Sequence, residues 1–558
     1  MVGASSSSSS LQANLIVEER NELMIPRETA GHSFRRTAHF LRPSAASVDG
    51  SGFPPVIPPM TLDDEKLSHK NLRVEVQFLG WNHPQQNWQT WIEHMHALHH
   101  LTWKESGIYE AIMCSKYKIH RNQDLIFSFS EKWCPETNTF VFPWGESTVT
   151  LEDVMALGGF SVLGNSNFTP IGEDEKEMKR IQKILVDERK NITKTTLKRA
   201  SQSAWVVKFM NSGSEIEHQA FLAYWLSRFV FPKFAKDSIG ETIIPLAIHL
   251  SRGTRIALAP AVLASMFKDL RSLKEALDAS RKQSSSGGFH KVKLSSPLQL
   301  LQVWIWERFP TLQPRPPNPT QPDDPKMARW NLLQFDVQNI STRINSSADD
   351  FLWRPHWGSS LAHKDKAAEW VRTKPDLGQG VMELARCWRV SELVGPDADY
   401  IEQYLPHRVA KQFGMDQDVP DFVPRVNSSP QAAWEYYTRP IEDEKLYIPG
   451  RLDESSVTTR YIFWWRKLVS GTEKRPVCID HPPGFEPKNK RPRHDLETET
   501  RDKGSGGSEF EVAVSPKSFM EDIANLEKRF IDLERDINLY KEAYSSSDLH
   551  EEGDSSSE

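Results

Sequence analysis

Residues 103–164 constrain the fold more than any other stretch, because they hold the densest run of local structural signals in the chain. Apolar residues at helical spacing predict a helix over 103–117. Alternating β-forming residues over 125–133, a Pro-Glu-Thr-Asn turn and an aromatic run over 139–144 then predict a β-hairpin. The stretch therefore predicts a helix followed by a small β element.

A capped helix is expected directly after this hairpin. Thr150 and Asp153 have the spacing of a capping box, in which two side chains satisfy the free backbone N–H groups at a helix start. The helix should run to Leu157, because Gly158 and Gly159 can adopt the left-handed conformation that ends helices. Helical patterns also predominate elsewhere in the chain. We therefore expect a mainly α fold with a small β-hairpin element, in the α+β class.

The motifs in this stretch resemble a known family. In order, they are SGI, WCPETNTF, FPWGE, TLEDV and GGFSVLG, all between residues 106 and 164. Two later blocks, 221–270 and 404–420, continue the resemblance in the same order. The family is the plant mobile domain, sometimes labelled aminotransferase-like, and it is similar to the core of the maintenance-of-meristems proteins. The resemblance spans residues 74–465 with gaps.

The resemblance implies a nuclear role in transposon silencing, genome stability and meristem maintenance. It also implies a protein partner, a serine/threonine phosphatase of the plant type 7-like group. Because the family's domain also occurs within transposable elements, a second hypothesis remains open. In that hypothesis the chain is a domesticated transposon-derived protein that contacts DNA or RNA.

Composition limits the remaining classes. With 558 residues, 38% of them hydrophobic, the chain can bury a sizeable core. The net charge of -6 gives no overall attraction for nucleic acid, so we expect any such contact to be local or indirect. Four scattered cysteines favour a reducing compartment. No apolar run approaches the ~20 residues of a membrane span, so we expect a soluble intracellular protein without a membrane partner.

Changes in composition along the chain predict five regions. Serine- and proline-rich stretches at the N-terminus, and polar stretches after the aromatic-rich middle, cannot bury enough surface to fold by themselves. The expected regions are a disordered arm (1–71), a globular core (72–470) with insertions at 165–200, 280–296 and 310–327, a polar linker (471–517), a coiled coil (518–545) and an acidic serine-rich tail (546–558).

Two features of the C-terminal regions suggest function. A basic cluster in the linker is typical of a nuclear import signal; its residues are Lys488, Lys490, Arg491 and Arg493. Apolar residues in alternating steps of four and three then predict a coiled coil that self-associates or binds a partner helix. These residues are Phe519, Ile523, Leu526, Phe530, Leu533, Ile537, Tyr540 and Tyr544. The alternative is a single amphipathic helix that packs back on the core.

A polar stretch in the third block of the resemblance is a candidate interaction surface. Its residues are Tyr404, His407, Arg408, Gln412 and Gln417. His407 and Arg408 could hold a phosphate or a carboxylate. In the structural alternative, Pro406 opens a short helix that Gly414 ends, and the polar side chains satisfy neighbouring backbone groups.

No enzyme class has a complete signature in the chain. His96 and His100 have a spacing that can share a metal, and His94 and His99 lie nearby, but no third ligand is evident, so an aromatic helix with a polar histidine face is favoured. A pyridoxal-phosphate enzyme needs a lysine, a phosphate-binding helix start and a partner acid, and we find no such set. We therefore expect a protein that is not an enzyme and holds no cofactor.

Overall fold

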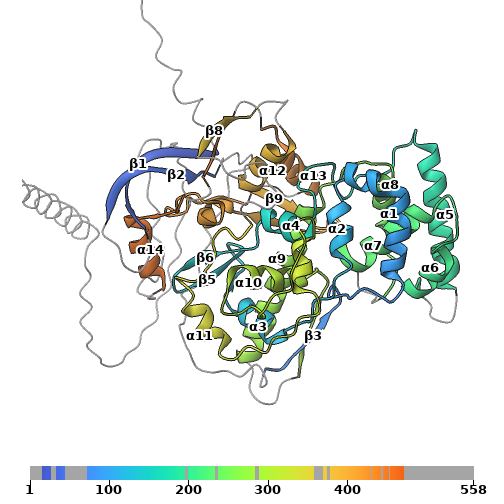
Figure 1. Cartoon of the computed structure of the whole chain (residues 1–558), viewed down its shortest axis with the longest axis horizontal. Coiled ribbons are helices and arrows are strands. Elements are labelled where there is room, and N and C mark those ends of the chain that lie inside the picture. Colours follow the sequence, from blue (N-terminus) through green and yellow to red (C-terminus); the bar gives the residue numbers. More distant parts are fainter. Residues whose placement is uncertain are drawn as a thin grey trace, which may run out of the picture. The chain divides into compact units, whose positions relative to one another are not determined.

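Helices make up most of the regular elements in the computed structural model, and short strands join them in small sheets (Figure 1). The structure describes residues 16–26, 33–43, 72–194, 199–232, 237–282, 288–356, 368–373, 378–425, 427, 429–441, 444–450 and 453–469. All of them belong to the first of two units, residues 1–478. The predicted import signal and coiled coil fall in the second unit, outside the described residues.

The α-helices are α1 (Trp88–Glu105), α2 (Tyr109–Cys114), α3 (Gln123–Glu131), α4 (Leu151–Gly158), α5 (Lys176–Thr193), α6 (Gln202–Phe209), α7 (Glu217–Trp225), α8 (Ile244–Ser251), α9 (Leu258–Lys282), α10 (Gln299–Arg308), α11 (Ile340–Asn345), α12 (Gln379–Trp388), α13 (Pro430–Thr438) and α14 (Thr459–Val469). A π-helical turn, η2 (Leu226–Val230), continues α7, and two 3₁₀ segments are η3 (Lys326–Trp330) and η4 (Pro406–Phe413).

The strands pair in small groups. They are β1 (Val17–Ile25), β2 (Phe34–Leu41), β3 (Val74–Phe78), β4 (Trp133–Cys134), β5 (Thr139–Phe142), β6 (Gly145–Ser147), β7 (His290–Leu294), β8 (Glu369–Arg372), β9 (Ser391–Val394), β10 (Ile401–Tyr404), β11 (Lys445–Ile448) and β12 (Val457–Thr458). The sheet orders are β12-β1-β2, β4-β5-β6, β10-β9, β11-β8 and β3-β7. This mainly helical architecture confirms the predicted α+β class.

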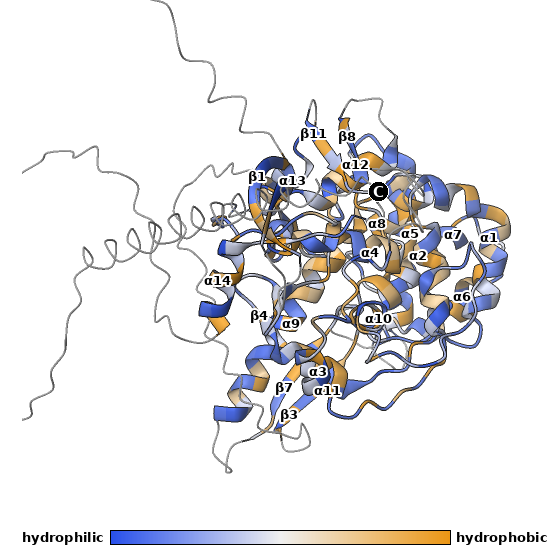
Figure 2. Ribbon diagram, turned by 60° about the vertical axis from the view of Figure 1, so that its left-hand side comes forward, coloured by the Kyte–Doolittle hydropathy of each residue, from blue (hydrophilic) through white to orange (hydrophobic). Residues whose placement is uncertain are grey.

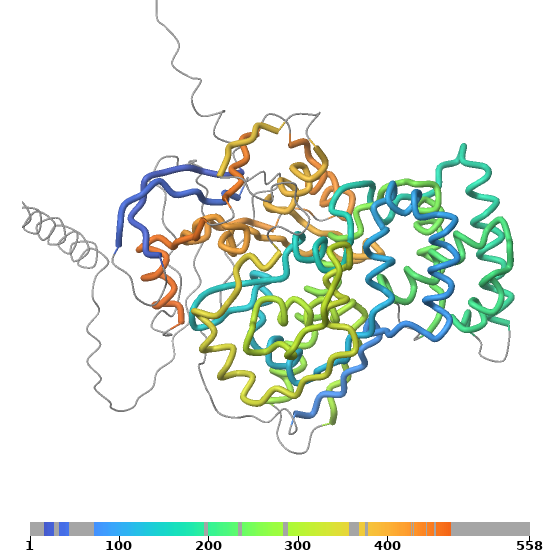
Figure 3. The backbone as a smooth tube through the Cα atoms, in the orientation of Figure 1, coloured from blue at the N-terminus to red at the C-terminus, as the bar shows by residue number. Residues whose placement is uncertain are grey.

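Helix α9 is the element around which the core is built. Every residue from Leu258 to Phe267 is buried, and a helix that is covered on all sides must lie inside the protein. It contacts α3, α4, β4, β7, β9 and β10. Figure 2 shows hydrophobic colouring concentrated on the inner helices, and Figure 3 traces the chain through them.

The predicted hairpin is correct only in its second half. Residues 125–131 form α3 rather than a strand, because the Asn122 side chain caps the helix by accepting the Leu125 N–H at 3.0 Å. All residues from Leu125 to Ser130 are buried, so their alternation does not mark one exposed face. The sheet begins at Trp133, which pairs with Phe140.

The helix predicted over 103–117 is also interrupted. Helix α1 ends at Glu105, and α2 starts at Tyr109. Between them, Gly107 has φ +72°, a left-handed conformation that favours glycine. By contrast, the capping box of Thr150 and Asp153 is confirmed at the start of α4.

The N-terminal arm is not disordered throughout, which corrects the prediction for residues 1–71. Strand β1 pairs with all of β2 through Val17 to Met24, and it also pairs with β12 through Met24 and Thr458. Met24, Ala38 and Phe40 form a small buried cluster. The partner strand comes from the far end of the core, so local composition could not reveal it.

The three predicted insertions differ in how much of each is packed into the core. The segment 280–296 is predicted to be an insertion, but its strand β7 pairs in parallel with β3, so part of it belongs to the core. The charged run within 165–200 forms α5, an amphipathic helix with Ile181 and Leu185 buried. Within 310–327, Leu312 is fully buried before η3 begins.

Candidate protein-interaction site

The five residues of the predicted interaction surface lie inside the protein. Tyr404, His407, Arg408, Gln412 and Gln417 are each at most 6% exposed. They sit at the end of β10, in η4 and just after it, where Gly414 adopts a left-handed φ of +80°. This burial contradicts the expectation of an exposed contact surface and agrees with the structural alternative.

Their hydrogen bonds explain why these polar groups tolerate burial. Arg408 forms an ion pair with Glu146 of β6 at 2.9 Å, and both side chains are buried. Gln412 accepts the Thr148 N–H and donates to the Thr148 carbonyl, each at 2.8 Å. Buried polar groups are stable when paired in this way. The segment therefore holds η4 against β6.

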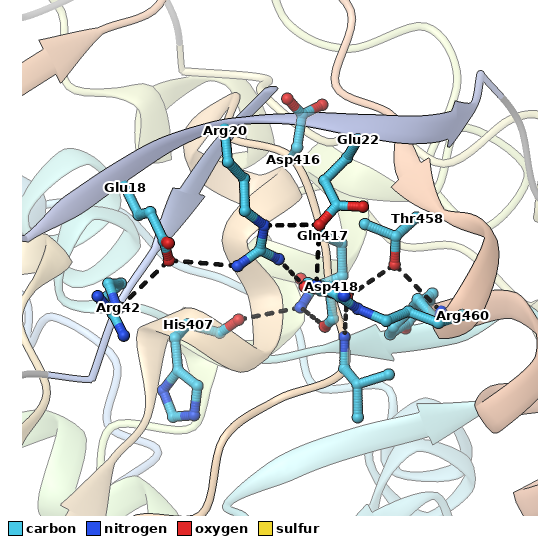
Figure 4. Close-up of polar contacts among 12 residues, drawn as sticks. Glu18, Arg20, Glu22, Arg42, His407, Asp416, Gln417, Asp418, Thr458 and Arg460 are labelled. Atoms are coloured by element: carbon cyan, nitrogen blue, oxygen red, sulfur yellow. Dashed lines mark hydrogen bonds and ion pairs between the residues drawn. The ribbon is translucent and has the colours of Figure 1, made fainter. Parts of the chain in front are cut away.

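Gln417 and its neighbours anchor the N-terminal hairpin (Figure 4). Gln417 accepts the Ala410 N–H and donates to the His407 carbonyl. Next to it, Asp418 binds Arg20 of β1 and Arg460 of α14, and Figure 4 shows these contacts meeting at one point. Burial alone would raise the pKa of Asp418, but its bonds to Arg460 and Thr458 outweigh burial and lower it.

A second buried polar group centres on Asp153, the capping residue of α4. Its Oδ2 accepts Trp304 Nε1–H at 3.1 Å. Its Oδ1 accepts Arg308 at 2.6 Å and lies 3.1 Å from His356 Nε2. Burial opposes ionisation, yet Arg308 and His356 together lower the pKa of Asp153 well below its usual range. Both carboxylate oxygens are therefore occupied by partners within the fold.

The His356 ring links this group to a lysine. Lys326 Nζ lies 3.0 Å from His356 Nδ1, and burial lowers the pKa of the Lys326 amine. The neighbouring Glu152 differs from Asp153, because burial and the Asp153 charge raise its pKa to about 7. A lysine, a histidine and a carboxylate in contact, with a second carboxylate next in the chain, resemble acid–base machinery. Here, however, Asp153 ties α4 to α10 and to the segment before residue 357, which is a structural task.

An open groove with a volume of about 450 Å³ lies between α1 and α5. We call it the α1–α5 groove. Its lining comes from α1, α5, the loop before α7 and the end of α8, and comprises His94, Met95, Leu98, His99, Glu177, Arg180, Ile181, residues 213–219, Ser251 and Arg252. Such a volume is typical of binding sites for small ligands or for a few side chains of a partner.

One wall of the α1–α5 groove is fixed from beneath by a buried carboxylate. Glu217 accepts the backbone N–H groups of Asn211 at 2.7 Å and Gly213 at 3.0 Å, and Trp91 Nε1–H at 3.1 Å. Gly213 has φ +65°, which this tight turn requires. The loop is therefore held in place before any partner binds.

Exposed leucines extend the groove along α1. Leu98 is 62% exposed and lines the groove, and Leu101, one turn further, is 70% exposed. Exposed leucines on one helix face, next to a hollow, are typical of a surface that receives the apolar side of a partner helix. Sequence reasoning missed this site, although Leu98 and Leu101 interrupt the polar face of α1 and could have marked it.

The histidines of α1 make contacts of their own. His99 stacks on His218 with ring centroids 3.8 Å apart, and His218 Nε2 accepts Trp103 Nε1–H at 2.9 Å. His96 lies 3.3 Å from the Tyr109 hydroxyl. Within the described ranges, no three His, Cys, Asp or Glu side chains come together as a metal site. These rings therefore pack α1 against α2 and α7.

No helix in the described part of the chain has both the length and the apolar composition needed to cross a membrane. No solved structure matches the chain.

Three curated relatives from Arabidopsis thaliana resemble the chain. The serine/threonine-protein phosphatase 7 long form homolog is 24% identical over 62% of this chain and 27% of its own length. Protein MAINTENANCE OF MERISTEMS is 26% identical over 55% of this chain and 60% of its own length. Protein MAIN-LIKE 1 is 22% identical over 54% of this chain and 55% of its own length. The chain thus covers less than two thirds of each relative.

The family profile of the plant mobile domain matches residues 107–466. This range contains the glycine break after α1, the capped helix α4, the central helix α9 and the buried segment η4. Because the match covers well over half of the chain, the chain belongs to the plant mobile domain family.

Proposed function

We propose that this chain is a non-catalytic nuclear protein-interaction module that acts in transposon silencing, genome stability and meristem maintenance. Family membership and the name of the relative Protein MAINTENANCE OF MERISTEMS support the biological setting. The α1–α5 groove carries the molecular part of the proposal. It combines a preformed wall with the exposed leucines of α1, a combination that suits a helix from a partner protein.

The proposed partner is a serine/threonine phosphatase of the plant type 7-like group. One relative, which matches 62% of this chain over 27% of its own length, is named as a phosphatase 7 long form homolog. Two regions that are joined in one protein often act together. We therefore propose that this chain binds a phosphatase that is encoded as a separate protein. The buried Asp153 group supports a non-catalytic role, since its carboxylate oxygens already hold Trp304, Arg308 and His356.

Affinity purification from plant nuclei tests this proposal. The intact chain is compared with a Leu98→Asp, Leu101→Asp double variant, in parallel samples with and without nuclease. The matched control is Val207→Asp, because Val207 of α6 is 86% exposed but does not line the groove. We expect the phosphatase to be recovered with the intact chain and with the control, and to be lost with the double variant.

Two results would contradict the proposal. Recovery of the phosphatase with the double variant would exclude the groove as its binding site. Recovery of chromatin-associated material alone, lost on nuclease treatment, would favour the alternative in which the chain contacts DNA or RNA. A purified phosphatase that binds the purified chain directly would exclude a bridging factor.

The C-terminal features complete the proposal and are tested separately. Alanine substitution of Lys488, Lys490, Arg491 and Arg493 should move a fluorescent fusion of the full chain out of the nucleus. Deletion of residues 518–545 should abolish self-association in light scattering if the heptads form a homotypic coiled coil. An unchanged mass would instead favour a partner helix.

A further inference from the structure

Basic side chains gather around His83 at one edge of the core. We call this group, comprising His83, Lys118, His120 and Arg121, the His83 cluster. The His83 and His120 ring centroids are 6.1 Å apart. Lys118, His120, Arg121 and Arg228 all lie close enough to repel a proton on His83. The cluster therefore concentrates positive potential at one place, although the chain as a whole has a net charge of -6.

The charges of the cluster have no acidic counterpart in the described part of the chain. Arg228 is compensated, since it forms an ion pair with Asp237 at 3.2 Å. Lys118, His120 and Arg121 form no ion pair with a carboxylate among the residues that the structure describes, and the leading charges that act on His83 are all basic. The cations here are Lys118 and Arg121, because burial and the neighbouring positive charges lower the pKa of His83 and His120. Cations without an acidic partner stabilise an anion that binds beside them.

The backbone beneath the cluster is fixed at both ends. Trp81 Nε1–H donates to the Ile119 carbonyl at 2.9 Å, which ties the His83 segment to the Lys118 segment. Gln302 donates to the His120 carbonyl and accepts the Asn122 N–H, each at 2.7 Å. Little backbone entropy is therefore lost when a ligand binds here.

The side chains also present defined donors. The Arg121 guanidinium lies 4.3 Å from the centroid of the Phe78 ring, and this packing sets its orientation. Gln334 Nε2 lies 3.3 Å from His120 Nδ1, so the His120 proton belongs on Nε2, where it can be donated. His83 Nδ1 is buried and forms no hydrogen bond within the described structure.

We propose that the His83 cluster binds a phosphate monoester carried by a serine or threonine side chain of a partner protein. Such a group has a charge near -2 and three acceptor oxygens, which match the Lys118 amine, the Arg121 guanidinium and the His120 N–H. A nucleic acid would need an extended basic track for its successive phosphates, whereas this cluster is compact. The inference rests on the proposed interaction function and specifies a second contact, separate from the α1–α5 groove.

Fluorescence anisotropy with the full chain tests the proposal. The probes are a labelled polyalanine peptide with one central phosphoserine, the same peptide with serine, and a short single-stranded oligonucleotide; inorganic phosphate serves as competitor. We expect the phosphopeptide to bind and phosphate to displace it. Lys118→Glu and Arg121→Glu should each weaken binding by roughly tenfold or more, since each removes a charge-assisted hydrogen bond.

Two controls separate recognition from stability. Lys183→Glu reverses an exposed charge on α5 and should leave phosphopeptide binding unchanged. Arg121→Lys keeps the charge and should retain part of the affinity, which a purely structural role would not predict. Equal binding of serine and phosphoserine peptides, or full binding by both charge-reversal variants, would overturn the proposal. Binding of the oligonucleotide alone would also overturn it and assign the cluster to nucleic acid.

The nuclear purification distinguishes this inference from the function on which it rests. Phosphatase-treated extract should yield less partner than untreated extract, and the Lys118→Glu variant should lose that difference. If the partner is recovered equally from both extracts and still depends on Leu98 and Leu101, the inference fails and the interaction function stands. If neither treatment nor the leucine variants change recovery, both fail.

Discussion

The η4 segment and the His83 cluster are both rich in basic and polar side chains, but they differ in burial and in the partners of those side chains. In η4, Arg408 is buried against Glu146, and Gln412 is bonded to the backbone of Thr148. In the His83 cluster, Lys118 and Arg121 are at least partly exposed and have no described carboxylate partner. Polar residues that satisfy one another hold a fold together, whereas polar residues left in need of a partner can recruit one.

Removing one charge from the η4 segment should produce the largest effect. Arg408→Met leaves the Glu146 carboxylate buried without its cation, so we expect the free energy of unfolding to fall by about 3–5 kcal/mol. Denaturant unfolding followed by circular dichroism measures this change. Adding Glu146→Leu should restore much of the loss, since both charges are then absent. A loss below about 1 kcal/mol in the single variant would show that η4 does not depend on the pair.

Removing the amide of Gln412 should have the next largest effect. Gln412→Ala leaves both the N–H and the carbonyl of Thr148 without their partner inside the protein, so we expect a loss of about 2–4 kcal/mol. The same unfolding measurement applies. The matched control is Gln431→Ala, because the Gln431 side chain donates to Glu435 on an exposed face. If the control variant loses as much stability, the loss in Gln412→Ala does not come from the burial of its hydrogen bonds.

Acid should weaken the protein through buried histidines. Burial, with Arg408 beside His407 and His99 beside His218, lowers the pKa of both His407 and His218 to about 3. The unfolded chain takes up these protons near pH 6.5, so it binds more protons than the native state below that pH. The free energy of unfolding should therefore fall by about 1.4 kcal/mol for each pH unit and each histidine as the pH decreases from 6.5.

Unfolding curves recorded at several pH values between neutrality and mild acid measure this slope. His218→Gln removes one titrating group but keeps an acceptor for the Trp103 N–H. The free energy of unfolding of this variant should therefore fall by about 1.4 kcal/mol less for each pH unit than that of the parent. An unchanged slope would mean that His218 is protonated in the native state.

The smallest effect on the free energy of unfolding is expected for a charge removed from the His83 cluster. Lys118→Met removes a positive charge, as Arg408→Met does, but it breaks no described ion pair and relieves repulsion around His83. We expect its free energy of unfolding to stay within about 0.5 kcal/mol of the parent. A loss comparable to that of Arg408→Met would show that Lys118 supports the fold and would remove the contrast between the two regions.

Some elements were predictable because their signals lie close together in the chain. The Thr150 and Asp153 capping box spans three residues, and Gly159 ends α4 with φ +69°, as the glycine pair indicates. The same reasoning failed at 125–131. There the alternating pattern favoured a strand, but Asn122 caps a helix and the core covers it on all sides.

Other features depend on residues that the chain brings together from far apart. Strand β1 pairs with β12, which is more than 400 residues later in the chain, and β7 pairs in parallel with β3. The predicted interaction surface failed for the same reason, because Glu146 and Thr148, which bury its polar groups, precede it by more than 250 residues. Likewise, the α1–α5 groove is built from four separate segments, and no local pattern marks it.

By itself, the sequence determined the family, the mainly helical class and the capped helix that ends in a glycine pair, since these depend on residue types and on contacts within a few positions. Only the tertiary structure decided which polar residues are exposed. Burial depends on which distant segments pack together: Arg408 meets Glu146 across 262 positions, whereas Lys118 and Arg121 meet no described acid. The chemistry of a charged side chain is local, but its use is set by its partners.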